Sequence, residues 1–83
     1  MPKLPAITPR KLEQKLKKFG FVLDHSSGSH RVYFHHETGR RAVVPFHAKD
    51  VKSGTLSAIL REARISRNEF VSSLTSYYIR SRK

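Results

Sequence analysis

The sequence predicts an α+β fold in which a three-stranded antiparallel sheet carries two helices on one face, with a short additional C-terminal helix. Two segments place apolar residues at helical spacing on one side only. Three short segments rich in β-branched and aromatic residues lie between them, joined by polar turns. Because each helix has a single apolar stripe, both are expected to cover the same sheet face. The 83 residues suffice for one small domain, with a core over about 8–74 and a basic tail over about 79–83.

The first helix is predicted to begin at Thr8-Pro9, because Thr caps free amides and Pro suits the first helical position. Gly20 is expected to end it with a left-handed cap. The residues before Thr8 are expected to form a loose lead-in. The apolar stripe consists of Leu12, Leu16 and Phe19. The rest of this helix is almost wholly basic, which fits a solvated face and a phosphate-binding face equally well.

Three strands are predicted next, over Phe21 to Leu23, His30 to His35 and Arg41 to Phe46. A polar turn over 26–29 separates the first two, and a hairpin turn containing Gly39 separates the last two. Pro45 suits a strand at the edge of the sheet. Of the neighbours Tyr33 and Phe34, one is expected to enter the core while the other stays on the open face, where it could stack on a base.

The second helix is predicted to follow an N-cap at Thr55, and its apolar stripe is Leu56, Ile59, Leu60 and Ala63. Ser66 and Glu69 have the spacing of a capping box, which opens a third helix. That helix would carry Phe70, Leu74 and one of the tyrosines at 77 and 78. The order helix, three strands, helix is the layout of a double-stranded-RNA-binding domain.

The chain carries 17 Lys and Arg against 6 Asp and Glu, a formal net charge of +11. Such an excess attracts polyanions, and RNA or DNA is the usual partner of a basic domain. The basic residues are scattered rather than blocked, which favours a folded nucleic-acid-binding face over a membrane surface. The absence of cysteine excludes disulfides, thiol catalysis and cysteine-based zinc fingers. No apolar run has the length of a signal peptide or a membrane span, so a cytosolic protein without a membrane partner is expected.

Three pieces of the sequence resemble the HicA toxins, the small endoribonuclease half of a bacterial toxin–antitoxin pair. They are GSHRVYFH (28–35), VVPFHAKDVKSGTL (43–56) and LSAILREARIS (56–66) followed by Glu-Phe. The first contains Gly-Ser-His with an aromatic three positions after the His, and the second contains Pro-x-His and then Gly-Thr-Leu. The resemblance implies a fold similar to the double-stranded-RNA-binding domain and mRNA cleavage without a metal or other cofactor. It also implies a HicB-type antitoxin as partner and one catalytic histidine, which falls on His30.

The residues around His30 support the same role independently. A polar turn precedes His30 and a β-forming run follows it, so the ring would be held by packing and still reach solvent. RNA cleavage without metal uses the ribose 2′-hydroxyl as nucleophile and needs protons to be moved. Histidine suits that task because its ordinary pKa, about 6.5, lies near neutral pH. The alternative is a structural role, in which His30 caps the strand or hydrogen-bonds the turn.

Cations near His30 would stabilise the charge that develops at phosphorus. The predicted RNA contacts are Ser29, Arg31, His47, Lys49, Lys52, Lys15 and Lys18. His47 could assist His30, bind phosphate or simply lie on the surface. A metal site at His25, His30 and His47 is disfavoured because no carboxylate or cysteine lies at ligand spacing with them. The second hypothesis for the whole chain is a non-catalytic module that binds double-stranded RNA by its shape.

Overall fold

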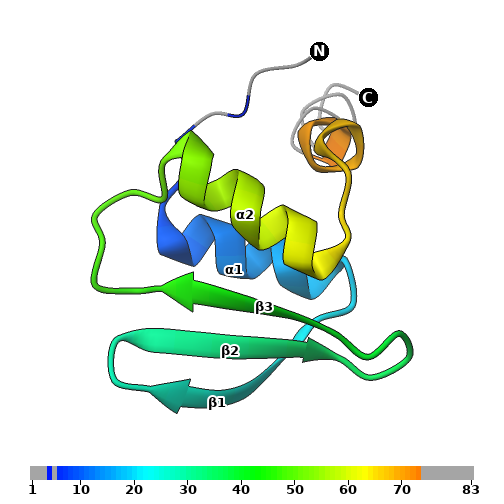
Figure 1. The fold of residues 1–83 in the computed structure, drawn as a ribbon, viewed down its shortest axis with the longest axis horizontal. Coiled ribbons are helices and arrows are strands. Elements are labelled where there is room, and N and C mark those ends of the chain that lie inside the picture. The colour runs from blue at the N-terminus through cyan, green and yellow to red at the C-terminus, as the bar shows by residue number, and fades with distance from the viewer. Residues whose placement is uncertain (1–3, 5, 74–83) are drawn as a thin grey trace, which may run out of the picture.

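The structure is a computed structural model that describes residue 4 and residues 6–73. Its elements follow the order α1 (Pro9–Lys18), β1 (Val22–Ser27), β2 (His30–His35), β3 (Arg40–Pro45) and α2 (Ser53–Ala63). A last helical segment covers residues 67–73 (Figure 1). This order confirms the predicted α+β fold. The expectations for Leu74, for the tyrosines at 77 and 78 and for the basic tail lie outside the described residues.

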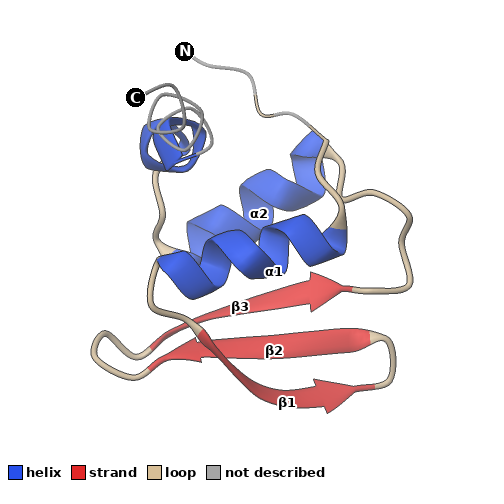
Figure 2. Ribbon diagram, turned by 180° about the vertical axis from the view of Figure 1, so that it is seen from behind, coloured by secondary structure: helices blue, strands red, loops and turns tan. Residues whose placement is uncertain are grey.

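The three strands form one antiparallel sheet in the order β1-β2-β3. Both α1 and α2 lie on the same side of it, over β3 rather than β1, as the two opposite views in Figures 1 and 2 agree. Tyr33 of β2 is fully buried toward the helices, together with its β3 partner Ala42. Because side chains alternate along a strand, His30 and Phe34 lie on the opposite, helix-free face. Tyr33 is therefore the aromatic that enters the core.

The core lies between the sheet and the helices. It consists of the apolar stripes of α1 and α2 together with Phe21, Tyr33, Ala42, Val44, Val51, Ile65 and Phe70. Two residues of the N-terminal segment, Leu4 and Ile7, are also buried in it. Ile7 exchanges two backbone hydrogen bonds with Val51, of 3.1 and 2.7 Å. The predicted loose lead-in is therefore wrong for Leu4 and Ile7, because both side chains are buried in the core and Ile7 is bridged to Val51.

Strand β1 is longer than predicted. It runs to Ser27 through polar residues and contains an irregularity between Leu23 and His25. All its residues are exposed, so the ladder to β2, rather than apolar side chains, extends it. The turn to β2 is correspondingly shorter and has Gly28 at φ +59. Strand β3 begins and ends one residue earlier than predicted, and it is an edge strand, as Pro45 suggested.

Both ends of α1 match the prediction from the sequence. The Lys11 amide donates to Thr8 Oγ1 at 3.2 Å, which confirms the N-cap. Gly20, the residue after the C-cap Phe19, has φ +95. The left-handed cap at Gly20 is thus confirmed.

The start of α2 does not match the prediction. The helix begins at Ser53 rather than after Thr55, and its N-cap Lys52 makes no side-chain capping bond. Its last residue is Ala63, and the C-cap Arg64 takes a left-handed conformation with φ +59. The capping box that follows is confirmed, because Ser66 Oγ accepts from the Glu69 amide at 3.0 Å and Glu69 Oε1 accepts from the Ser66 amide at 3.1 Å. Over the described part of the chain, no helix is long and apolar enough to cross a bilayer.

Candidate functional site

Four segments meet at one end of the sheet. The β1–β2 turn, the last residues of β3, and the N-termini of α1 and α2 all lie at the left of Figure 1. The turn itself is closed by the pairing of Ser27 with His30. Two backbone contacts join it to the end of β3: His30 pairs with Pro45 in the sheet, and the Phe46 amide donates to the Ser29 carbonyl at 2.7 Å. Polar residues far apart in the sequence are therefore held together at this end.

His30 is the first residue of β2 and its side chain is exposed. It lies on the helix-free face, at the end of the middle strand. The ring of His47, two residues beyond β3, packs edge-on against it, with ring centroids 5.4 Å apart and an interplanar angle of 62°. His47 is also exposed. The structure thus brings together two of the histidines that the sequence singled out.

Arg31, the next residue along β2, points to the opposite face, toward α1. Its Nη1 donates to Glu13 Oε2 at 3.1 Å, and its guanidinium lies 4.1 Å from the centre of the Phe46 ring. The Arg31 side chain keeps 41% of its surface exposed. Arg31 therefore joins α1, β2 and the segment that leads to His47, and part of its guanidinium still faces solvent.

Glu13 was not among the residues predicted for the site. It accepts a second hydrogen bond, 2.5 Å long, from the Tyr33 hydroxyl. This bond from Tyr33, aided by the nearby Lys17 and Arg31 charges, lowers the pKa of Glu13 despite partial burial. Burial first and the Glu13 carboxylate second raise the pKa of Tyr33. One signal in the sequence marks Glu13, because it is the single acid of this basic helix and lies beside the apolar stripe, four residues after Pro9.

The predicted lysines fall into two groups. Lys49 and Lys52 are exposed on the loop that runs from His47 to the start of α2. Lys15 and Lys18 belong to the last turns of α1, at the other end of that helix. Lys15 is only 6% exposed, its Nζ donates to the Ser73 carbonyl at 3.4 Å, and burial lowers its pKa. Its burial argues against the predicted RNA contact, whereas the role of the exposed Lys18 stays a prediction.

The other histidines have contacts of their own. His25 Nδ1 lies 2.7 Å from Asp24 Oδ2, His35 Nδ1 accepts from the Thr38 amide at 3.3 Å, and the His36 ring packs on Phe34. Within the ranges that the structure describes, no three His, Asp or Glu side chains gather closely enough to hold a metal ion.

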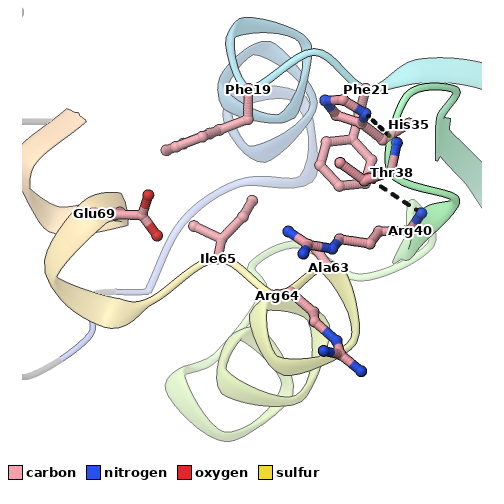
Figure 3. Close-up of a pocket in the computed structure, with 9 residues that line it drawn as sticks. All are labelled: Phe19, Phe21, His35, Thr38, Arg40, Ala63, Arg64, Ile65 and Glu69. Carbon is pink, nitrogen blue, oxygen red and sulfur yellow. Dashed lines mark hydrogen bonds between the residues drawn. The ribbon is translucent and has the colours of Figure 1, made fainter.

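A hollow of about 100 Å³ lies at the opposite end of the sheet (Figure 3). Its residues are Phe19, Phe21, His35, Thr38, Arg40, Ala63, Arg64, Ile65 and Glu69. Three of its polar residues bond within the protein, through the His35–Thr38 bond drawn in Figure 3 and the Glu69 capping bond. The hollow is a junction between α1, α2 and the β2–β3 turn.

The α-β-β-β-α order with both helices on one face, and a histidine pair beside basic residues at one end, defines a small basic domain of the double-stranded-RNA-binding fold class. The family model for the HicA toxin of bacterial toxin–antitoxin systems matches residues 9–65, more than half of the chain. The chain therefore belongs to the HicA toxin family. The matched range contains Glu13, His30 and His47, and it ends before the helical segment 67–73. No curated protein gives a significant match.

Proposed function

We propose that this toxin is a metal-independent endoribonuclease that cleaves mRNA, with His30 as its general acid–base group. The observation that carries the proposal is the position of His30 in a HicA toxin. Its ring is exposed at the end of the central strand, and among the described residues neither ring nitrogen makes a hydrogen bond or an ion pair. A substrate can therefore reach both nitrogens.

The reaction that suits this site is an internal transesterification. The ribose 2′-oxygen attacks the adjacent phosphorus, the bond from phosphorus to the 5′-oxygen breaks, and the products are a 2′,3′-cyclic phosphate and a 5′-hydroxyl. One proton leaves the 2′-hydroxyl and one is delivered to the 5′-oxygen. A positioned side chain that carries such a proton contributes about 10²- to 10⁴-fold to the rate.

The RNA backbone is proposed to run past the basic end of the sheet. Its proposed contacts are Ser29, Arg31, His47, Lys49 and Lys52. The first amides of α2 support this path, because a helix N-terminus attracts phosphate and no side chain caps it here. The exposed part of the Arg31 guanidinium would add to the stabilisation of charge at phosphorus.

The proposed protein partner is a HicB-like antitoxin that covers the His30 end of the sheet. An acidic surface on this partner would complement the +11 charge and speed association. A gene for such a partner next to the gene for this chain is the expected arrangement.

Incubation of the purified protein with a long transcript, with and without EDTA, tests the proposal. Cleavage that survives EDTA and leaves cyclic phosphate ends is the expected result. Salt-dependent binding with intact RNA recovered would instead support the non-catalytic double-stranded-RNA-binding module. Cleavage that EDTA abolishes would point to a metal-dependent nuclease.

Expression in bacterial cells supplies a second test. The parental chain is expected to arrest growth, and His30→Ala is expected to restore it at an equal protein level. His36→Ala is a suitable control, because His36 is an exposed histidine that follows the same strand and packs on Phe34. Growth arrest by His30→Ala as severe as that by the parental chain would contradict the assignment.

A further inference from the structure

His30 and His47 come from different parts of the chain and meet through a fixed backbone frame. His30 opens β2, whereas His47 lies in the loop after β3. The His30–Pro45 pair of the sheet and the 2.7 Å bond from the Phe46 amide to the Ser29 carbonyl hold the two segments in register. The 5.4 Å separation of the ring centroids follows from this frame.

The side chains behind the rings strengthen the frame. Arg31 follows His30 in sequence, and Phe46 precedes His47. The Arg31 guanidinium lies over the Phe46 ring and is tied to Glu13 of α1. The residues adjacent to the two histidines are therefore joined to each other and to the core side of the sheet.

The free ring nitrogens distinguish this pair from His25 and His35. His25 is bound to Asp24, and His35 is bound to the Thr38 amide. Among the residues that the structure describes, the rings of His30 and His47 make no hydrogen bond or ion pair, and they are the two histidines whose rings pack on each other. Four ring nitrogens at one exposed end thus remain available to a substrate.

We propose that His30 and His47 act as a proton-transfer pair on one phosphodiester, an inference that rests on the proposed function. One imidazole takes the proton from the 2′-hydroxyl as the 2′-oxygen bonds to phosphorus. The other, in its protonated form, gives a proton to the 5′-oxygen as the bond from phosphorus to that oxygen breaks. A hydrogen bond reaches about 3 Å, so rings this close can contact the 2′-oxygen and the 5′-oxygen on either side of the same phosphorus atom. His47 is then a catalytic residue rather than a phosphate contact.

A substrate with sulfur in place of the bridging 5′-oxygen tests the pair, because a thiolate leaves without being protonated. The experiment compares the parental protein, His30→Ala, His47→Ala and the control His36→Ala on a short RNA that spans a cleavage site mapped on the transcript. On ordinary RNA, each of His30→Ala and His47→Ala is expected to lose about 10²- to 10⁴-fold in single-turnover rate. On the sulfur substrate, one of these two variants is expected to regain most of the parental rate and the other is not. Far-UV circular dichroism of each variant checks the fold.

Several results would overturn the proposal that His30 and His47 form a proton-transfer pair. If His47→Ala cleaves ordinary RNA at the parental rate while His30→Ala does not, the pair is wrong and the proposed function stands. If both variants are impaired and the sulfur substrate rescues neither of them, or both alike, His47 has no separate proton-transfer role. If the parental protein itself leaves ordinary RNA intact, the proposed function fails, and the pair fails with it.

Discussion

Glu13 shows how one side chain supports the candidate site from the core side of the sheet. Its side chain is only 15% exposed, and its carboxylate accepts hydrogen bonds from Tyr33 and Arg31. A carboxylate with two such donors is stabilised in its charged form, which lowers its pKa. Removal of the charge is expected to loosen Arg31 and, through Arg31, the Phe46 segment next to His47.

The lowered pKa of Glu13 predicts a pH dependence of stability. The stabilisation is present above the pKa of this group in the unfolded chain and is lost as the pH falls through its lower value in the folded protein. Glu13→Gln is therefore expected to reduce the free energy of unfolding by about 1–3 kcal/mol near neutral pH. The difference from the parental protein should shrink over the pH range below the ordinary glutamate pKa of about 4.5. Urea unfolding across this range measures it.

Glu37→Gln is the matched control, because Glu37 is an exposed residue of the β2–β3 turn. If the free energies of unfolding of the parental protein and Glu13→Gln differ by the same amount at every pH between about 7 and 3, the account is contradicted.

The junction between α1 and the sheet depends on the absence of a side chain at Gly20. The residue has φ +95, and a Cβ built there would lie 2.6 Å from His35 Nε2 on β2. The His35 ring has little room to move, because it packs edge-on against Phe21 and accepts a hydrogen bond from the Thr38 amide. The helix therefore ends where the chain must pass close to a strand.

Gly20→Ala is expected to lower the free energy of unfolding by more than the strain of a positive φ angle alone. The left-handed conformation costs about 1–2 kcal/mol for alanine. Gly39→Ala carries that cost without a clash, because its φ is +73 and nothing lies within 4 Å of a built Cβ. Gly20→Ala should therefore lower the free energy of unfolding more than Gly39→Ala does. This excess loss should disappear when His35→Ala is added. Urea unfolding of the three single variants and the two double variants measures this excess, and equal costs at Gly20 and Gly39 would refute it.

The sequence predicted the elements well where a local rule decides their ends. Thr8, Gly20 and the Ser66–Glu69 box act through bonds within a few residues, and all three are present. Prediction failed where contacts with distant parts of the chain determine the order or the length of a segment. Ile7 is ordered by its bridge to Val51, and β1 is extended by pairing with β2 despite its polar sequence. Neither partner is visible from local spacing.

The site was predictable in part for the same reason. The motif around His30 singled out this histidine as the candidate, and its predicted exposure at the start of a strand is confirmed. The contact between His30 and His47 depends on the ladder that aligns β2 with β3, and the role of Glu13 depends on how α1 packs on the sheet. The burial of Lys15 has the same origin, because its Nζ meets the Ser73 carbonyl, 58 positions away in sequence.

On the scale of the whole molecule, the net charge of +11 predicts that RNA binding is strongly salt-dependent. With His30→Ala as the background, so that the RNA stays intact, the double change Lys49→Ala and Lys52→Ala is expected to weaken binding to all sequences alike. The slope of log affinity against log salt should fall by about 1 for each lysine–phosphate interaction that the change removes. Fluorescence anisotropy at several salt concentrations measures it.

Lys17→Ala is the control for that experiment, because Lys17 is an exposed lysine in the last turn of α1, away from His30. If Lys17→Ala lowers the salt slope as much as the loss of one loop lysine does, the proposed RNA path is contradicted.

The central claim is that His30 moves protons during RNA cleavage, and the most direct measurement is the single-turnover cleavage rate of His30→Ala in the presence of EDTA. The account predicts a rate lower than the parental rate by about 10²- to 10⁴-fold, with RNA affinity and thermal unfolding unchanged. A purified, folded His30→Ala protein that cuts the transcript at the parental rate would contradict it.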